Sequence, residues 1–315
     1  MSDSDLLDRF RETFSVLIPK FENSDQRLGL AVSGGPDSVA LLLLAHRCFP
    51  DQISAASVDH GLRPEAQNEC EFVAALCQKY GIEHEILKPT TPIRGSIQME
   101  ARKARYALLH MWIERQELNW LATAHHADDQ LETLIMRILR GSGIDGMSAI
   151  RARRGQIVRP LLRFTKAELQ EFVKNQDVIA VDDPSNQDRS FDRVRVREAL
   201  SKLSGFDVAQ ASQSAAALDD ARLAIYWMVD ELAALHIRSN EDGSTLDKHD
   251  FPHEIVRRLL LKCLHMCDPS LSPRGNQLET LIATLRRGET ATIGNILCRG
   301  GLTWRFSPAP KRNNR

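Results

Sequence analysis

One short segment of the chain has the residue types that bind phosphate, namely Ser33, Gly34, Gly35, Pro36, Asp37 and Ser38. Glycines let the backbone turn sharply and point amide groups at an anion, and a helix beginning at Pro36 would add partial positive charge. Asp37 alone would repel phosphate, so we expect it to bind a Mg²⁺ ion that contacts the phosphates. The lysine of a GxxxxGK[ST] loop is missing, which favours cleavage at the α-phosphorus with pyrophosphate as leaving group. The alternative is an ordinary turn with an aspartate at a helix start.

A second polar cluster follows an apolar run at 119–124. It contains His125 and the acids Asp128, Asp129 and Glu132. His125, Asp129 and Glu132 are spaced i, i+4 and i+7, which places them on one face of a helix. Such a face could bind a second metal ion, recognise a cationic substrate or transfer protons. Acids that merely suit the dipole of a helix start are the alternative.

A third loop follows the apolar run 53–58. His60 and Arg63 could contact nucleotide phosphates there, and the backbone of Val58 could bind an adenine edge. Arg105, in the segment 101–106, could also reach a phosphate. In each case the alternative is an ordinary solvated loop or helix face.

Arginines gather in two later segments. Residues 151–163 hold five arginines and no acid, and residues 189–202 hold five basic and two acidic residues. Clustered arginines suit an RNA backbone, although solvated surface would also explain them. The candidate RNA-binding residues are Arg151, Arg153, Arg154, Arg193, Arg195 and Arg197.

The elements that must position these residues alternate between strand and helix. Apolar runs predict strands at 28–33, 53–58, 83–87 and 119–124, and amphipathic patterns predict helices at 36–46, 64–80, 97–117 and 127–139. The order predicts an α/β fold, a parallel sheet with helices on both faces and a ligand at the carboxyl ends of the strands.

The second half of the chain reads differently. Thr165 to Glu168 has the pattern of a capping box that opens a short helix. Beyond it we predict helices at 206–237, 252–266 and 276–286 and a terminal hairpin from 290–298 and 302–306. We therefore expect a catalytic domain at 1–205 and a mainly helical domain at 206–315.

Composition limits the class of protein. The 315 residues carry a net charge of −1, so a nucleic acid must bind through local patches. Six cysteines without a CxxC pair indicate reduced thiols. The acidic start does not fit a signal peptide, and the apolar stretch 28–45 is interrupted at 34–37. We expect a cytoplasmic protein that does not span a membrane.

Several motifs in order carry a family resemblance. After the phosphate-binding turn come VDHGLR (58–63), ARKARY (101–106), TAHHADDQLET (123–133) and RGSGIDG (140–146), then RPLL (159–162) and DPSN (183–186). The set resembles bacterial tRNA(Ile)-lysidine synthetases, which belong to the N-type ATP-pyrophosphatase group with an adenine nucleotide alpha hydrolase-like fold. The family tends to have asparagine where Val194 stands, and leucine and glycine where Met147 and Ala149 stand.

The resemblance implies an ATP-dependent carbon–nitrogen ligase. It also implies that the domain at 206–315 contacts tRNA. Its substrates would be the anticodon loop of tRNA(Ile) and free L-lysine, with ATP and Mg²⁺ as cofactors and Asp37 as metal ligand. ATP would adenylate the wobble cytidine at C2, and the lysine amine would then displace AMP. The oligomeric state is left open, with a homodimer as one alternative. Alternatives for function are a tRNA thiolase, an NAD or GMP synthetase-like enzyme, or a non-enzymatic nucleotide-binding regulator.

Overall fold

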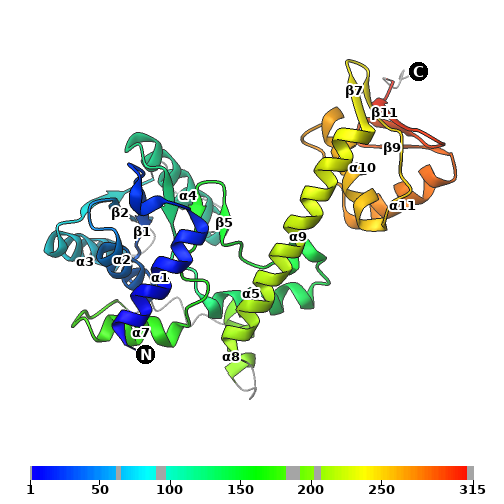
Figure 1. Cartoon of the computed structure of the whole chain (residues 1–315). Coiled ribbons are helices and arrows are strands. Elements are labelled where there is room, and N and C mark those ends of the chain that lie inside the picture. Colours follow the sequence, from blue (N-terminus) through cyan, green and yellow to red (C-terminus); the bar gives the residue numbers. More distant parts are fainter. Residues whose placement is uncertain (1, 62–64, 90–96, 182–191, 202–206, 311–315) are drawn as a thin grey trace. The chain divides into compact units, whose positions relative to one another are not determined.

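The computed structural model describes residues 2–61, 65–89, 97–181, 192–201 and 207–310. The chain forms two compact units, Met1–Asp219 and Asp220–Arg315, whose elements are labelled in Figure 1. Arg63 and the segment 183–186, both singled out in the sequence, lie outside the described residues. None of the described helices is long and apolar enough to cross a membrane.

The first unit is built on a six-stranded sheet with the order β3-β2-β1-β4-β6-β5. The strands are β1 (Leu28–Ala31), β2 (Ile53–Val58), β3 (Glu83–Leu87), β4 (Trp120–Ala122), β5 (Arg153–Arg154) and β6 (Ile157–Val158). All neighbours pair in parallel except β5 and β6. The first four strands fall on the predicted apolar runs, which confirms the predicted parallel α/β fold. The sequence did not predict the short strands β5 and β6.

Helices connect these strands. They are α1 (Asp3–Leu17), α2 (Pro36–Cys48), α3 (Glu65–Tyr80), α4 (Ile97–Arg115), α5 (Ala127–Leu139), α6 (Ile144–Met147), α7 (Lys166–Lys174) and α8 (Asp192–Ser201), with a 3-10 turn at Phe21–Asn23. Sequence patterns missed α1, which begins after Ser2. The predicted capping box is present at α7, where the Thr165 hydroxyl accepts a hydrogen bond from the Glu168 amide at 3.3 Å.

Side chains alternate between the two faces of the sheet, as the period of a strand requires. Leu28 and Leu30 of β1 belong to a core that also takes residues from α1, α2, α3 and α7. On the other face, Trp112 of α4 packs with residues of β2 and β4. Helices therefore cover both faces of the sheet and leave its strand ends to the loops.

The second unit combines helices with an antiparallel sheet of order β7-β8-β11-β10-β9. Its elements are the end of α9 (Val208–His236), β7 (Ile237–Asn240), β8 (Gly243–Leu246), α10 (His253–Cys267), α11 (Gly275–Arg286), β9 (Thr290–Ile293), β10 (Ile296–Arg299) and β11 (Trp304–Pro308). The three helices lie where the sequence predicts them. The predicted terminal hairpin is wrong in its first strand, because 290–298 is divided by a turn into β9 and β10, which pair with each other. The sheet is also larger than predicted, because β8 pairs with β11 and β7 pairs with β8.

The start of α9 belongs to the first unit. Ala215 is fully buried, and the Ser212 hydroxyl donates to the Leu162 carbonyl at 2.5 Å. These contacts explain why the two units divide between Asp219 and Asp220, inside α9, and not at the start of the helix near residue 206.

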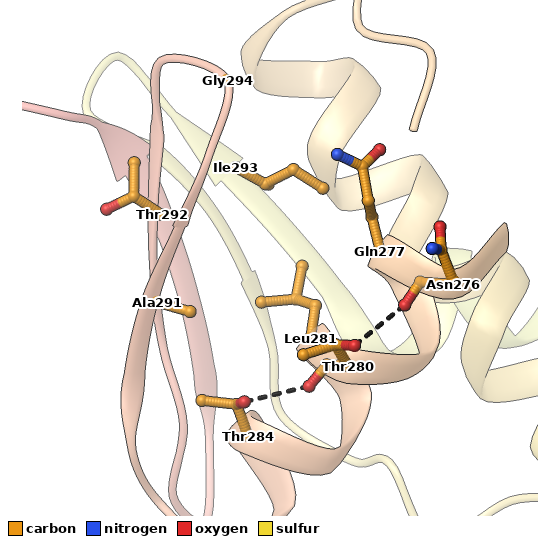
Figure 2. A pocket seen from close by; sticks show the side chains of 9 residues that line it. All are labelled: Asn276, Gln277, Thr280, Leu281, Thr284, Ala291, Thr292, Ile293 and Gly294. Atoms are coloured by element: carbon orange, nitrogen blue, oxygen red, sulfur yellow. Dashed lines mark hydrogen bonds between the residues drawn. The ribbon is translucent and has the colours of Figure 1, made fainter. Parts of the chain in front are cut away.

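A cleft of about 330 Å³ lies in the second unit, between α11 and the β9–β10 hairpin. Figure 2 shows amide and hydroxyl groups at its rim and aliphatic side chains between them. The hydroxyls of Thr280 and Thr284 donate to the carbonyls of Asn276 and Thr280, both at 2.9 Å, so they are occupied within the helix.

We predict that Gly29 in β1 cannot be replaced by alanine without loss of stability. A Cβ atom at this position would lie 2.6 Å from Cζ3 of the buried Trp112 ring. Such overpacking should lower the free energy of unfolding by about 1–3 kcal/mol in urea denaturation. In a Trp112→Leu background the same Gly29→Ala change should cost clearly less, and an equal cost in both backgrounds would contradict the clash.

Candidate functional site

The register of the sheet brings three loops to one edge. Leu28 at the start of β1 pairs with Ile53 of β2 and with Trp120 of β4. Because all three strands run in the same direction, the residues that follow them emerge side by side. The phosphate-binding turn after β1, the loop after β2 and the acidic start of α5 after β4 therefore meet at the carboxyl edge, as the sequence predicts.

The glycine-rich turn has the geometry of an anion site. Gly34 has a φ of +90°, a conformation that glycine adopts without strain, and Gly35 is the N-cap of α2 with Pro36 following it. Ser38 fixes the bend, because its hydroxyl accepts from the Ser33 amide at 3.1 Å and donates to the Gly35 carbonyl at 2.9 Å. The amides at the start of α2 are thus held in an arrangement that suits an anion.

Asp37 lies in the first turn of α2, and its environment fits a metal ligand. Its Oδ1 is buried and has no hydrogen-bond partner among the described residues. A buried carboxylate oxygen without a partner is costly, and a cation would satisfy it. Mg²⁺ commonly takes one or two protein carboxylates together with substrate phosphates, so a single aspartate beside a phosphate site is sufficient.

His126 links this turn to the acids of α5. Its Nε2 lies 3.5 Å from Asp37 Oδ2 and 3.7 Å from Asp129 Oδ2, and its Nδ1 lies 3.5 Å from Asp128 Oδ2. Burial lowers the pKa of His126, but the surrounding Asp128, Asp37 and Asp129 carboxylates outweigh that effect and raise the pKa to about 10. The imidazolium therefore balances charge between the two loops at neutral pH.

His125, the histidine that we had placed in the site, has a different environment. Its Nδ1 is 3.0 Å from the Thr123 hydroxyl, and burial lowers its pKa to about 4, so the ring is neutral. The sequence contains one signal that His126, and not His125, belongs to the site, since His126 lies three residues before Asp129. This spacing allows the His126 amide to donate to the Asp129 carboxylate at 3.1 Å.

The three acids of α5 differ in their partners. Asp128 accepts a hydrogen bond from the Lys166 amide at 2.7 Å and so ties α5 to the start of α7. Burial raises the pKa of Asp128, but His126 and the Lys166 amide outweigh it and the net shift is downward. Burial also raises the pKa of Asp129. The positive charges of His126 and Arg193 outweigh this effect, so the net shift of the pKa is again downward. Both carboxylates are therefore ionised at neutral pH.

Glu132 forms an ion-pair cluster with α8. Its carboxylate is almost fully buried and contacts Arg197 Nε at 2.6 Å and Arg193 Nε at 3.0 Å. Arg193 also donates to the Thr133 hydroxyl at 3.1 Å. Two of the predicted RNA-binding arginines thus hold α8 against α5, at the helix face that carries the acids.

The loop after β2 brings His60 and Arg105 together. The Arg105 Nε lies 3.4 Å from the His60 Nε2, so these two predicted nucleotide-binding residues share one location next to Val58 at the end of β2. Asp59, which lies between Val58 and His60 in sequence, accepts a hydrogen bond from the Gly61 amide at 2.9 Å and forms an ion pair with Lys88 at 3.2 Å. The aspartate thereby shapes the turn.

The remaining predicted arginines occupy the surface. Arg153 stacks on the Trp120 ring at 4.4 Å and donates to the Leu17 carbonyl at 3.2 Å. Arg154 and Arg195 are exposed, whereas Arg151 is half-buried. The side chains at 151, 153 and 154 belong to one short segment around β5.

Comparison with known families defines the class of this molecule. The family model of the PP-loop domain matches residues 6–204, so the chain belongs to that family.

Similarity to curated proteins identifies a narrower family within this class. The chain is 39% identical over 91% of its length to tRNA(Ile)-lysidine synthase of Zymomonas mobilis, covering 89% of that protein. It is 38% identical over 97% of its length to the synthase of Novosphingobium aromaticivorans, covering 94%. The chain is therefore a member of the tRNA(Ile)-lysidine synthase family.

Solved structures agree on the fold. The chain is similar to the U34-tRNA thiolase NcsA from Methanococcus maripaludis, solved with its [4Fe-4S] cluster, with a TM-score of 0.57 and 15% identity. The match covers 68% of this chain and 78% of the thiolase. At this identity the likeness concerns the fold alone.

We predict that the two glycines of the turn differ in their effect on stability. Gly34→Ala places a side chain at a φ of +90° and 3.4 Å from the Glu69 carbonyl oxygen, and should lower the free energy of unfolding by about 1–2 kcal/mol. Gly35 has an ordinary φ of −70° and no atom nearer than 4.0 Å, so Gly35→Ala should change it by less than about 0.5 kcal/mol. Urea denaturation measures the free energy of unfolding of both variants. Equal losses would contradict the prediction that only Gly34 needs the conformational freedom of glycine.

Proposed function

We propose that this chain uses ATP to join lysine to C2 of the wobble cytidine of tRNA(Ile), releasing AMP and pyrophosphate. The observation that carries the proposal is the similarity of nearly the whole chain to lysidine synthases, together with the match of residues 6–204 to the PP-loop domain. The reaction uses tRNA, so we place it in the cytoplasm.

The chemistry takes two steps. In the first, the C2 carbonyl oxygen of the cytidine attacks the α-phosphorus of ATP, an oxygen–phosphorus bond forms and pyrophosphate leaves. In the second, the ε-amine of lysine attacks C2, loses a proton, and AMP departs with the former carbonyl oxygen. Neither step needs a protein nucleophile, so the task of the chain is to position the reactants and stabilise charge.

The phosphate-binding turn supports the first step. Residues 33–38 would bind the β- and γ-phosphates through the amides at the start of α2, which leaves the α-phosphorus toward the sheet edge. Val58, His60 and Arg105 would bind the rest of the nucleotide from the loop after β2. Asp37 would bind Mg²⁺, which when present neutralises charge on the departing pyrophosphate.

The acids of α5 support the second step. Asp128 and Asp129 present ionised carboxylates around His126 and supply negative potential for the metal or for the lysine ammonium group. Glu132 is already paired with Arg193 and Arg197, so we infer that it acts through them by holding α8 in place. The exposed arginines at 153, 154 and 195, with Arg151, would bind the tRNA backbone.

A single assay tests this function. With purified protein, Mg-ATP, labelled lysine and total tRNA, we expect the label to enter RNA and the adenine product to be AMP. Omission of either tRNA or lysine should prevent formation of the modified base. AMP formation from a free nucleotide and ammonia, without tRNA, would instead favour an NAD or GMP synthetase-like enzyme, and ADP as product would contradict the mechanism.

We predict that Asp37→Asn lowers turnover below about one hundredth of the wild-type rate, because the neutral amide binds Mg²⁺ poorly. The fold should remain intact, as judged by circular dichroism and urea denaturation. Asp51→Asn is the matched control, since Asp51 is exposed and precedes β2 at the opposite edge of the sheet. Unchanged ATP consumption in the Asp37 variant would contradict the mechanism, and a wild-type protein that binds ATP without consuming it would favour a non-enzymatic nucleotide-binding regulator.

A further inference from the structure

A buried glutamine joins the acidic helix to the start of the arginine segment. Gln130 follows Asp129 in α5, and only 3% of its surface is exposed. Its Nε2 donates to the Ile150 carbonyl at 2.8 Å, and its Oε1 accepts from the Ile150 amide at 2.7 Å. One side-chain amide therefore satisfies both polar backbone groups of a single residue, which fixes its position and its orientation.

The next two residues are fixed by Arg159. This side chain is 7% exposed, and its Nη1 donates to the Arg151 carbonyl at 2.7 Å. Its backbone amide donates to the Ala152 carbonyl at 2.9 Å. The backbone of residues 150–152 is thus bound on one side by α5 and on the other by the segment that begins after β6.

The residue before this segment adopts an unfavourable conformation. Ala149 has a φ of +50°, in the left-handed region that non-glycine residues rarely occupy. Strained backbone persists where the surrounding contacts over-determine it. The hydrogen bonds of Gln130 to Ile150 are contacts of this kind, so the path of the chain into Arg151 is imposed and does not follow from local preference.

We propose that Gln130 and Arg159 are positioning residues for RNA. By fixing the backbone of residues 150–152 against α5, they hold the Arg151 side chain where it contacts a tRNA phosphate beside the carboxylates of that helix. This inference rests on the proposed function. It adds to that function the way in which the RNA-binding segment is held in place relative to the reacting nucleotide. Neither side chain needs to touch a substrate.

The test uses a substitution that removes the hydrogen bonds without changing charge. Gln130→Met keeps the length of the side chain, and we expect it to raise the KM for tRNA about tenfold, or about 1.4 kcal/mol. The KM for lysine and the Kd for ATP should stay within twofold of wild type. The slope of log K for tRNA against log salt concentration should fall in magnitude by about one, because one phosphate contact is lost.

Arg151→Ala should produce the same changes, and the double variant should be no weaker than the single variants, since both remove one contact. A merely structural glutamine would not alter the salt dependence of RNA binding. If Gln130→Met does not fold, Arg159→Lys must show the same selective rise in the KM for tRNA, because a lysine keeps the charge but not the fork that reaches the Arg151 carbonyl.

Gln52→Met is the matched control. Gln52 also binds backbone through its amide, donating to the carbonyls of Phe21, Ser24 and Gln26, but it lies just before β2 at the opposite edge of the sheet. Its loss should reduce stability and leave the KM for tRNA unchanged. An unchanged KM or salt slope in the Gln130 variant, or an equal rise in the constants for all substrates, would overturn the inference. Failure of the proposed function would show differently, as a wild-type protein that binds ATP but makes no lysidine.

Discussion

The parallel pairing of β1 with strands on both of its sides is the constraint on which the site depends. β1 lies in the middle of the sheet, between β2 and β4, and the strands share a direction. Three loops separated by up to about a hundred residues in sequence therefore end at one edge. Covering helices occupy both faces, so this edge is the place where backbone amides, carboxylates and a nucleotide can meet. Substitutions that disturb the packing of β1 act on all three loops together.

Charge balance at this edge explains why so many acids can lie together. Asp37, Asp128 and Asp129 converge on the single imidazolium of His126, and Glu132 is paired separately with two guanidinium groups. Without these cations the carboxylates would repel one another and the PP-loop would be pushed away from α5. The glycine-rich turn and the helix that carries the acids are thus coupled electrostatically through His126.

Local sequence patterns predicted the helices and strands, whereas contacts between distant parts of the chain determine which side chains meet at the site. The strands at 53–58 and 83–87 and the helix at 127–139 match the predicted ranges, because apolar periodicity and turn residues specify them locally. β5 and β6 were not predicted, because a strand of two residues is too short to show an alternation of apolar and polar residues. Residue types alone do not distinguish His125 from His126. Only the spacing between His126 and Asp129 offers a signal, because the contact of the His126 ring with Asp37 joins two loops that are far apart in sequence. Likewise Glu132 and Arg193 are far apart in sequence, and their ion pair depends on how α8 packs.

Arginines in the first unit have different kinds of partner. Arg193 and Arg197 contact Glu132 and so belong to the framework around the acids, although their sequence segment reads as an RNA-binding cluster. Arg159 is more buried than either and contacts backbone carbonyl oxygen. The Arg153 guanidinium lies over the Trp120 ring. A basic segment therefore predicts an acidic partner, but the sequence of the segment does not say whether that partner is a carboxylate of the protein or a phosphate of a ligand. Arg193 and Arg197 find their acidic partner in Glu132, and Arg159 finds a backbone carbonyl, so these three guanidinium groups serve to position the chain.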